Sequence, residues 1–185
     1  MQTEIIIAGF GGQGVLFGGT LLAQTAVEQG LSTTWFPNYG AEMRGGTANS
    51  TVIIAKGAIG SPVALHPGVL IAMNEQSLKR FLPRITPGGM VIINSSLIPA
   101  AVAKAVLTAA GNTHTAFSLP ATDIASADIG NVQTANVVMV GAFLKLSGIL
   151  TIENARAACV AVLTDKPKLV AINQKALECG YAFKQ

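Results

Sequence analysis

The chain has 185 residues, of which 50% are apolar and only 11% are charged, and its formal net charge is +3. Soluble domains usually carry about a quarter charged residues, so this chain either enters a membrane or covers much of its surface with protein partners. Its basic residues are scattered, which argues against a nucleic-acid-binding protein. The length suits one α/β domain, and we expect residues 1–185 to form a single domain.

The longest uncharged stretch, from Ile5 to Val27, is long enough to be considered as a membrane-spanning helix. It contains a cluster of glycines directly after a strand-like segment, which favours a turn over a continuous helix in lipid. The first residues also lack the basic segment and small-residue cleavage site of a secretory signal. We therefore expect a cytoplasmic protein without a membrane span.

Strand and helix patterns alternate along the chain. Apolar and β-branched runs predict strands at 4–8, 32–36, 50–55, 69–73, 90–94 and 113–118. Helices are predicted between Gly14 and Gly30, and at 75–82, 96–110, 132–146, 152–163 and 168–182. Pro37 is expected to end the second strand and to open a loop at 38–46. The order predicts an α/β fold, a Rossmann-like open and mostly parallel sheet flanked by helices, with a helical C-terminal part.

A glycine loop follows the first predicted strand and has the spacing GxGxxG at Gly9, Gly11 and Gly14. Without side chains the backbone can approach a phosphate, and the next helix offers free N–H groups and a positive dipole end. The second strand ends without the carboxylate that holds a nicotinamide ribose, and Asn38 is a weak substitute. Two interpretations stay open: the loop binds an anion, or it permits a tight turn against a neighbouring chain.

A second polar loop combines Tyr39, Glu42 and Arg44 with three glycines in a chain otherwise poor in charge. Loops after strand ends gather at the ligand crevice of an open α/β sheet, so we expect it to face the crevice of the glycine loop. Arg44 can pair with a phosphate or carboxylate in fork geometry. The alternative is an ion pair between Glu42 and Arg44 within the loop, without a ligand.

No residue pattern predicts a self-sufficient active site. Cys159 and Cys179 are far apart and cannot supply the four thiolates of an iron–sulfur cluster. His66 and His114 have no cysteine or carboxylate nearby at metal-ligand spacing. We therefore expect no catalytic residue and no metal site on this chain alone.

Two motifs carry a family resemblance. Gly9-Phe10-Gly11-Gly12-Gln13-Gly14-Val15 resembles the GxGGQG opening of the gamma subunits of 2-oxoacid:ferredoxin oxidoreductases. Tyr39-Gly40-Ala41-Glu42-Met43-Arg44-Gly45-Gly46 resembles the YGxExRGG loop of the same family. Weaker similarity continues at 70–74, 87–89, 94–98 and 129–131 and at Asn136 and Gly141, so it spans nearly the whole chain.

The resemblance implies a subunit of an enzyme that oxidatively decarboxylates a 2-oxoacid to an acyl-CoA. The assembled complex would use thiamine diphosphate, Mg²⁺, iron–sulfur clusters and coenzyme A, none of them firmly bound by this chain. Its partners would be alpha and beta subunits, with a delta subunit as an additional candidate, and ferredoxin would accept the electrons. The implied cofactor-binding or interface residues are Gly9, Gly11, Gly12, Gln13, Gly14, Asn38, Tyr39, Glu42, Arg44 and Gly45.

The substrate type is suggested by two details. Phe10, and Thr47 after the Arg-Gly-Gly triplet, resemble the 2-oxoglutarate type more than the pyruvate type. The branched-chain and indolepyruvate types stay open as alternatives within the family. Outside it, the alternatives are a stand-alone Rossmann-type nucleotide-binding protein, an NAD(P)-dependent oxidoreductase, or a purely structural scaffold subunit.

Overall fold

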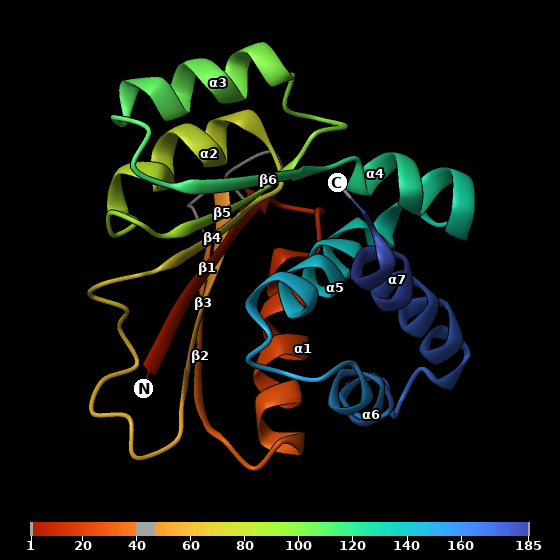
Figure 1. Cartoon of the computed structure of the whole chain (residues 1–185). Coiled ribbons are helices and arrows are strands. Elements are labelled where there is room, and N and C mark those ends of the chain that lie inside the picture. Colours follow the sequence, from red (N-terminus) through yellow and green to blue (C-terminus); the bar gives the residue numbers. More distant parts are fainter. Residues whose placement is uncertain (1, 40–46, 185) are drawn as a thin grey trace.

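The computed structural model describes residues 2–39 and 47–184, and Tyr39 by its backbone alone. In this part of the chain six strands form one sheet, in the order β2-β3-β1-β4-β5-β6 (Figure 1). The strands are β1 (Gln2–Phe10), β2 (Ser32–Tyr39), β3 (Thr47–Ala55), β4 (Val69–Ala72), β5 (Met90–Asn94) and β6 (Thr115–Leu119). β1, β4, β5 and β6 are mutually parallel, whereas β3 runs antiparallel to both β1 and β2. The predicted α/β fold with a mostly parallel sheet is confirmed.

Helices cover both faces of the sheet. α2 and α3 lie on one face, and α1, α5, α6 and α7 form a layer on the other (Figure 1). The helices are α1 (Val15–Glu28), α2 (Glu75–Phe81), α3 (Ala100–Ala109), α4 (Ala121–Ile124), α5 (Ala135–Ser147), α6 (Ile152–Val162) and α7 (Val170–Ala182). Because α1 follows β1 on one face and α2 follows the neighbouring β4 on the other, the topology switches between β1 and β4.

The core consists of two apolar clusters separated by the sheet. Along β1, Ile5 and Ile7 belong to the cluster that includes α1 and α5, while Ile6 and Ala8 belong to the one that includes α2 and α3. Successive side chains of a strand point to opposite faces, so a strand covered on both sides is apolar at every position. This is the physical reason for the continuous apolar run that predicted β1.

The expected end of the second strand at Pro37 is wrong. β2 continues through Pro37 to Tyr39 and keeps its register with β3, pairing Asn38 with Asn49. β2 is an edge strand that pairs only with β3 among the described residues. A proline is tolerated there because its missing N–H removes no bond from a central ladder. Asn38 therefore lies in the strand and not in a loop.

Two predicted helices begin later than expected. α3 starts at Ala100 and not at residue 96, because the chain first makes a turn in which Leu97 and Ile98 donate their backbone N–H groups to Asn94. α5 starts at Ala135 and not at residue 132, after a 3₁₀ turn capped by the Asn131 side chain. Short turns of this kind at helix N-termini are set by local hydrogen bonds. They do not change the spacing of apolar residues, so the sequence pattern does not distinguish them from the helix.

The uncharged stretch from Ile5 to Val27 is divided between β1, the glycine turn and α1. Within residues 2–39 and 47–184, no helix has the length and apolarity needed to cross a membrane.

Helix α5 is buried around its whole circumference from Ala135 to Leu144. It packs against α7 at two glycines. A Cβ on Gly141 would collide with the backbone carbonyl of Leu177, and one on Gly180 with that of Val138. The two helix backbones are therefore in contact, and any side chain at Gly141 or Gly180 would collide with a carbonyl group of the other helix.

Gly180→Ala is expected to lower the free energy of unfolding by about 2 kcal/mol. Overpacking costs about 1–3 kcal/mol, and more where backbone must move, while the better helix propensity of alanine returns ~1 kcal/mol. Urea unfolding of the purified chain would measure the change. Gly57→Ala is the matched control, because a Cβ at Gly57 meets nothing within 4 Å. Equal stability of the two variants would contradict the close backbone contact.

Candidate functional site

The glycine turn joins the end of β1 to the start of α1. Gly12 and Gly14 have φ angles of 99° and 69°, in the left-handed region where only glycine is free of strain. A Cβ on Gly14 would also collide with the side-chain amide of Asn136. Both glycines are therefore fixed by backbone conformation, and Gly14 also by its contact with α5.

Asn136 holds the turn from the side of α5. Its side chain is 2% exposed, its amide nitrogen donates to the Gly14 carbonyl, and its oxygen accepts the backbone N–H of Val137. Both ends of a buried amide are thus satisfied, as burial requires. In the sequence Asn136 stood out only as part of the family resemblance, since nothing local shows that it reaches residue 14.

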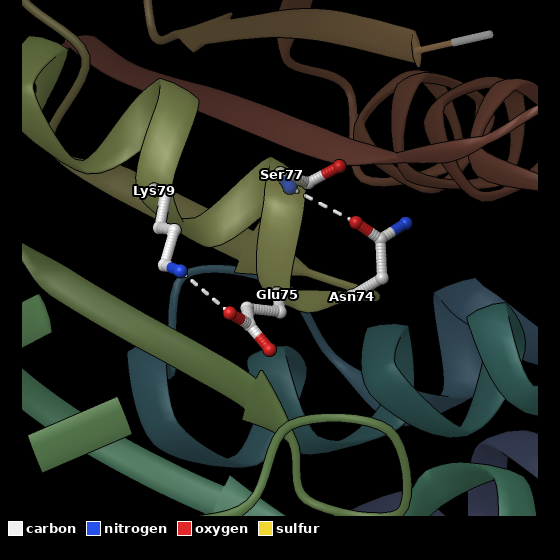
Figure 2. Close-up of polar contacts among 4 residues, drawn as sticks. All are labelled: Asn74, Glu75, Ser77 and Lys79. Atoms are coloured by element: carbon white, nitrogen blue, oxygen red, sulfur yellow. Dashed lines mark hydrogen bonds and ion pairs between the residues drawn. The ribbon is translucent and has the colours of Figure 1, made fainter. Parts of the chain in front are cut away.

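Gln13 closes the turn on its other side. Its side-chain oxygen accepts the backbone N–H of Phe10 at 2.7 Å and the amide of Asn74 at 2.7 Å. A Cβ on Gly9 would lie only 2.7 Å from that oxygen, so Gly9 leaves room for the side chain to fold back. Asn74 is itself the N-cap of α2, and its oxygen accepts the N–H of Ser77 at 2.9 Å (Figure 2). The turn is therefore linked to the loop after β4, across the switch point of the sheet.

A cavity of about 460 Å³ lies beside the glycine turn. Val15, Leu16 and Phe17 of the first turn of α1 line it, and none of their backbone N–H groups has a partner among the described residues. These are the orphan donors of a helix N-terminus, which carries a partial positive charge. The remaining described residues of the lining are Phe10, Gly11, Gly12, Gly14, Ala48, Asn131, Gln133, Thr134, Asn136, Leu163, Lys166, Leu169 and Asn173.

The polar character of this cavity comes from amides, a hydroxyl and one cation. Lys166 is the only charged side chain among the described lining residues. Backbone donors, neutral amides and one ammonium group are suited to an anionic or carbonyl-bearing ligand. No carboxylate of the described lining would repel such a group.

The segment that carries the second motif begins and ends beside the glycine turn. Thr47, the first residue of β3, pairs with Phe10, and Tyr39 pairs with Ala48, which lines the cavity. The residues that bound the segment thus lie at the end of the sheet that carries the glycine turn. Glu42, Arg44 and Gly45 lie outside the described residues.

The strand order argues against a nicotinamide site. β3 lies between β1 and β2 and runs antiparallel to both, so the end of β2 is one strand further from the glycine turn than in a dinucleotide-binding unit. The described end of β2 also carries Asn38 and no carboxylate.

The two histidines and Cys159 do not line this cavity. The backbone N–H of His66 donates to Glu4 near the opposite end of β1, and the ring of His114 contacts the carbonyl of Ile85. Burial raises the pKa of the Cys159 thiol to about 12, so it stays protonated near neutral pH. Within residues 2–39 and 47–184, no three His, Cys, Asp or Glu side chains come together in a way that could hold a metal.

Comparison with known proteins points to one family. A family model described as pyruvate ferredoxin/flavodoxin oxidoreductase matches residues 4–183. Ketoisovalerate oxidoreductase subunit VorA of Methanothermobacter thermautotrophicus is 37% identical over 181 residues, which is 97% of this chain and 36% of the relative. The 2-oxoglutarate synthase subunit KorC of the same organism is 33% identical over 159 residues, 85% of this chain and 83% of the relative. The chain thus spans about a third of its ketoisovalerate relatives but most of KorC.

Solved structures share the fold. The gamma subunit of a keto/oxoacid ferredoxin oxidoreductase from Geobacter sulfurreducens superposes with a TM-score of 0.76 at 27% identity, covering 97% of this chain and 96% of that one. A 2-oxoglutarate:ferredoxin oxidoreductase from Magnetococcus marinus, solved with 2-oxoglutarate, coenzyme A and succinyl-CoA, gives a TM-score of 0.81. At 20% identity, over 98% of this chain and 30% of that one, it indicates the fold alone.

Gly14→Ala should destabilise the chain more than Gly12→Ala. Both place a Cβ in the left-handed region at a cost of about 1–2 kcal/mol, but only Gly14 also meets Asn136, whereas a Cβ on Gly12 meets nothing within 4 Å. We expect a loss of about 3 kcal/mol for Gly14→Ala. Urea unfolding would measure both.

Asn136→Ala tests the cause of that difference. The double variant Gly14→Ala/Asn136→Ala should lose at least ~1 kcal/mol less free energy of unfolding than the sum of the two single variants, because Asn136→Ala removes the side chain with which the new Cβ collides. Strict additivity would contradict the contact between Gly14 and Asn136.

Proposed function

Because the chain belongs to the pyruvate ferredoxin/flavodoxin oxidoreductase family, we propose that it is the gamma subunit of a 2-oxoacid:ferredoxin oxidoreductase. The observation that carries the proposal is the family match over residues 4–183, which agrees with the resemblance of the two glycine-rich motifs. With alpha and beta subunits, the complex would convert a 2-oxoacid and coenzyme A to an acyl-CoA and CO₂ and pass the electrons to ferredoxin. We further propose that residues 1–185 act as one domain and that the complex is cytoplasmic.

The redox cofactors are assigned to the partner subunits. The described residues do not fit an iron–sulfur cluster, since no three His, Cys, Asp or Glu side chains come together among them. Cys159 is buried and Cys179 is partly exposed, and two thiols are too few for a cluster. The proposed contribution of this chain is therefore to bind and position, and no step of the redox chemistry is assigned to its residues.

We propose that the glycine turn and its 460 Å³ cavity form part of the coenzyme A side of the assembled site. The uncapped first turn of α1 offers backbone donors to a phosphate or carbonyl oxygen, and Lys166 offers a positive charge. Tyr39, Glu42, Arg44 and Gly45 would form the edge of this site, because the segment that holds them starts and ends beside it.

Two oxoacids are supported by different observations. Phe10 and the Arg-Gly-Gly-Thr sequence favour 2-oxoglutarate, and KorC, at 33% identity, is a 2-oxoglutarate synthase subunit. The 37% identity to a ketoisovalerate oxidoreductase subunit favours a branched-chain 2-oxoacid as the second candidate. We keep 2-oxoglutarate as the proposal because KorC also matches this chain in length.

The chain, co-expressed with the products of neighbouring genes and purified through a tag on this subunit, should yield a multi-subunit complex that contains iron. The complex should reduce viologen or ferredoxin only when both a 2-oxoacid and coenzyme A are present. Rates with 2-oxoglutarate, 2-oxoisovalerate, pyruvate and indolepyruvate would identify the substrate. Recovery of the tagged chain alone, without thiamine-dependent partners, would sink the proposal.

Lys166→Gln in that complex should raise the KM for coenzyme A about twofold to fivefold and leave kcat nearly unchanged. An exposed ion pair is worth up to ~1 kcal/mol, and 1.4 kcal/mol is a factor of ten. Lys168→Gln is the matched control, since Lys168 is also exposed but does not line the cavity. Equal KM values for both variants would remove Lys166 from the proposed site.

A further inference from the structure

The orientation of the Gln13 amide is determined by backbone groups that cannot reverse. The N–H of Ser77 requires the oxygen of Asn74, which turns the Asn74 nitrogen away from α2 (Figure 2). That nitrogen in turn requires the oxygen of Gln13, as does the backbone N–H of Phe10. Exchanging the nitrogen and oxygen of Gln13 would set donors against donors at both contacts.

The Gln13 nitrogen is consequently left as a donor with no acceptor among residues 2–39 and 47–184. Gln13 lines a crevice of about 160 Å³ at the carboxyl end of the parallel strands. Besides Gln13 after β1, the crevice is lined by Met73 after β4, Leu97 after β5 and Thr122 after β6. It is therefore the switch-point crevice of this sheet, where open α/β folds bind their ligands.

The polar side chains of this crevice carry no charge, and those of Gln13 and Thr122 offer hydrogen-bond donors. The Thr122 hydroxyl accepts a bond from Asn94 at 2.9 Å, so its own hydrogen is available to another acceptor. Gln133 adds a further amide, whose side chain has no partner among the described residues. Without a cationic side chain, the crevice favours an uncharged carbonyl oxygen over a phosphate or carboxylate.

Two large apolar side chains line the same crevice and are open to solvent. Leu97 is 43% exposed and Val132 is 55% exposed, although both are aliphatic. Met73 and Ala135 complete the apolar lining. An occupant with an apolar side chain next to an uncharged carbonyl would match both halves of this surface, and an extended polypeptide repeats that combination at each residue.

We propose that this crevice is a docking site for an uncharged, extended segment of a partner subunit. A backbone carbonyl of the segment accepts the N–H of Gln13, and an apolar side chain inserts between Leu97 and Val132. The inference rests on the proposed function in requiring partner subunits. It gives Gln13 a role separate from that of the larger cavity, whose described lining does not include it.

Gln13→Glu removes the N–H donor of the Gln13 side chain and keeps the oxygen that accepts the two internal bonds. A carboxylate still accepts the bonds from Phe10 and Asn74 but presents an oxygen where the partner's carbonyl would lie. We expect the melting temperature of the isolated chain to be unchanged or raised, and the Kd for the partner subunits to rise at least tenfold. Gln13→Ala should lower the melting temperature and weaken assembly as well. Gln76→Glu, the same change at an exposed position of α2 whose side chain has no bond to the described residues, is the control.

Val132→Gln tests the apolar half of the surface and should weaken assembly several-fold without lowering the melting temperature, because Val132 is 55% exposed in the chain alone. If Gln13→Glu assembles with wild-type affinity, the docking site is wrong. A Gln13→Glu complex that assembles normally but needs more coenzyme A would assign the crevice to a small ligand, which also overturns it. Failure of the wild-type chain to assemble would instead overturn the proposed function.

Discussion

The bond between the Asn136 amide and the Gly14 carbonyl joins the most deeply buried helix to the turn on which the candidate site depends. Asn136 can approach so closely only because residue 14 has no side chain, and residue 14 can turn into α1 only in the left-handed region. One contact thus sets the position of the helix N-terminus relative to the core. Gly141 and Gly180 bring α7 against the same helix, so small residues set the contacts of α5 with both α1 and α7.

The apolar composition has two physical sources. Helix α5 is buried on all sides by α7 and its other neighbours, and β1, β4 and β5 are covered on both faces, which accounts for apolar residues within the chain itself. Other apolar side chains remain open to solvent at the carboxyl end of the sheet, notably Leu97 and Val132. The apolar composition therefore reflects both the buried elements of the fold and this exposed surface.

Most strands and helices could be predicted from the sequence. A strand buried on both faces is a continuous apolar run, and a helix buried on one face has apolar residues at helical spacing. The insertion of β3 between β1 and β2 could not be predicted, since antiparallel pairing is set by contacts distant in sequence. The same holds for Pro37, whose tolerance depends on β2 being an edge strand. Within the site, the glycine turn could be predicted from the spacing of its glycines. The bond of Asn136 to Gly14, more than a hundred residues away, and the orientation of the Gln13 amide could not, because both depend on tertiary hydrogen bonds.

The central place of β1 has a consequence for the order of events during synthesis. Its two neighbours in the sheet are β3 and β4, which lie at 47–55 and 69–72, and the helix on its other face, α2, begins only at Glu75. The isoleucines of β1 therefore leave the ribosome well before any strand can pair with them. Such a nascent chain exposes an apolar, strand-forming segment for longer than a chain of local hairpins would, and both edges of β1 stay open to pairing with other chains during that time.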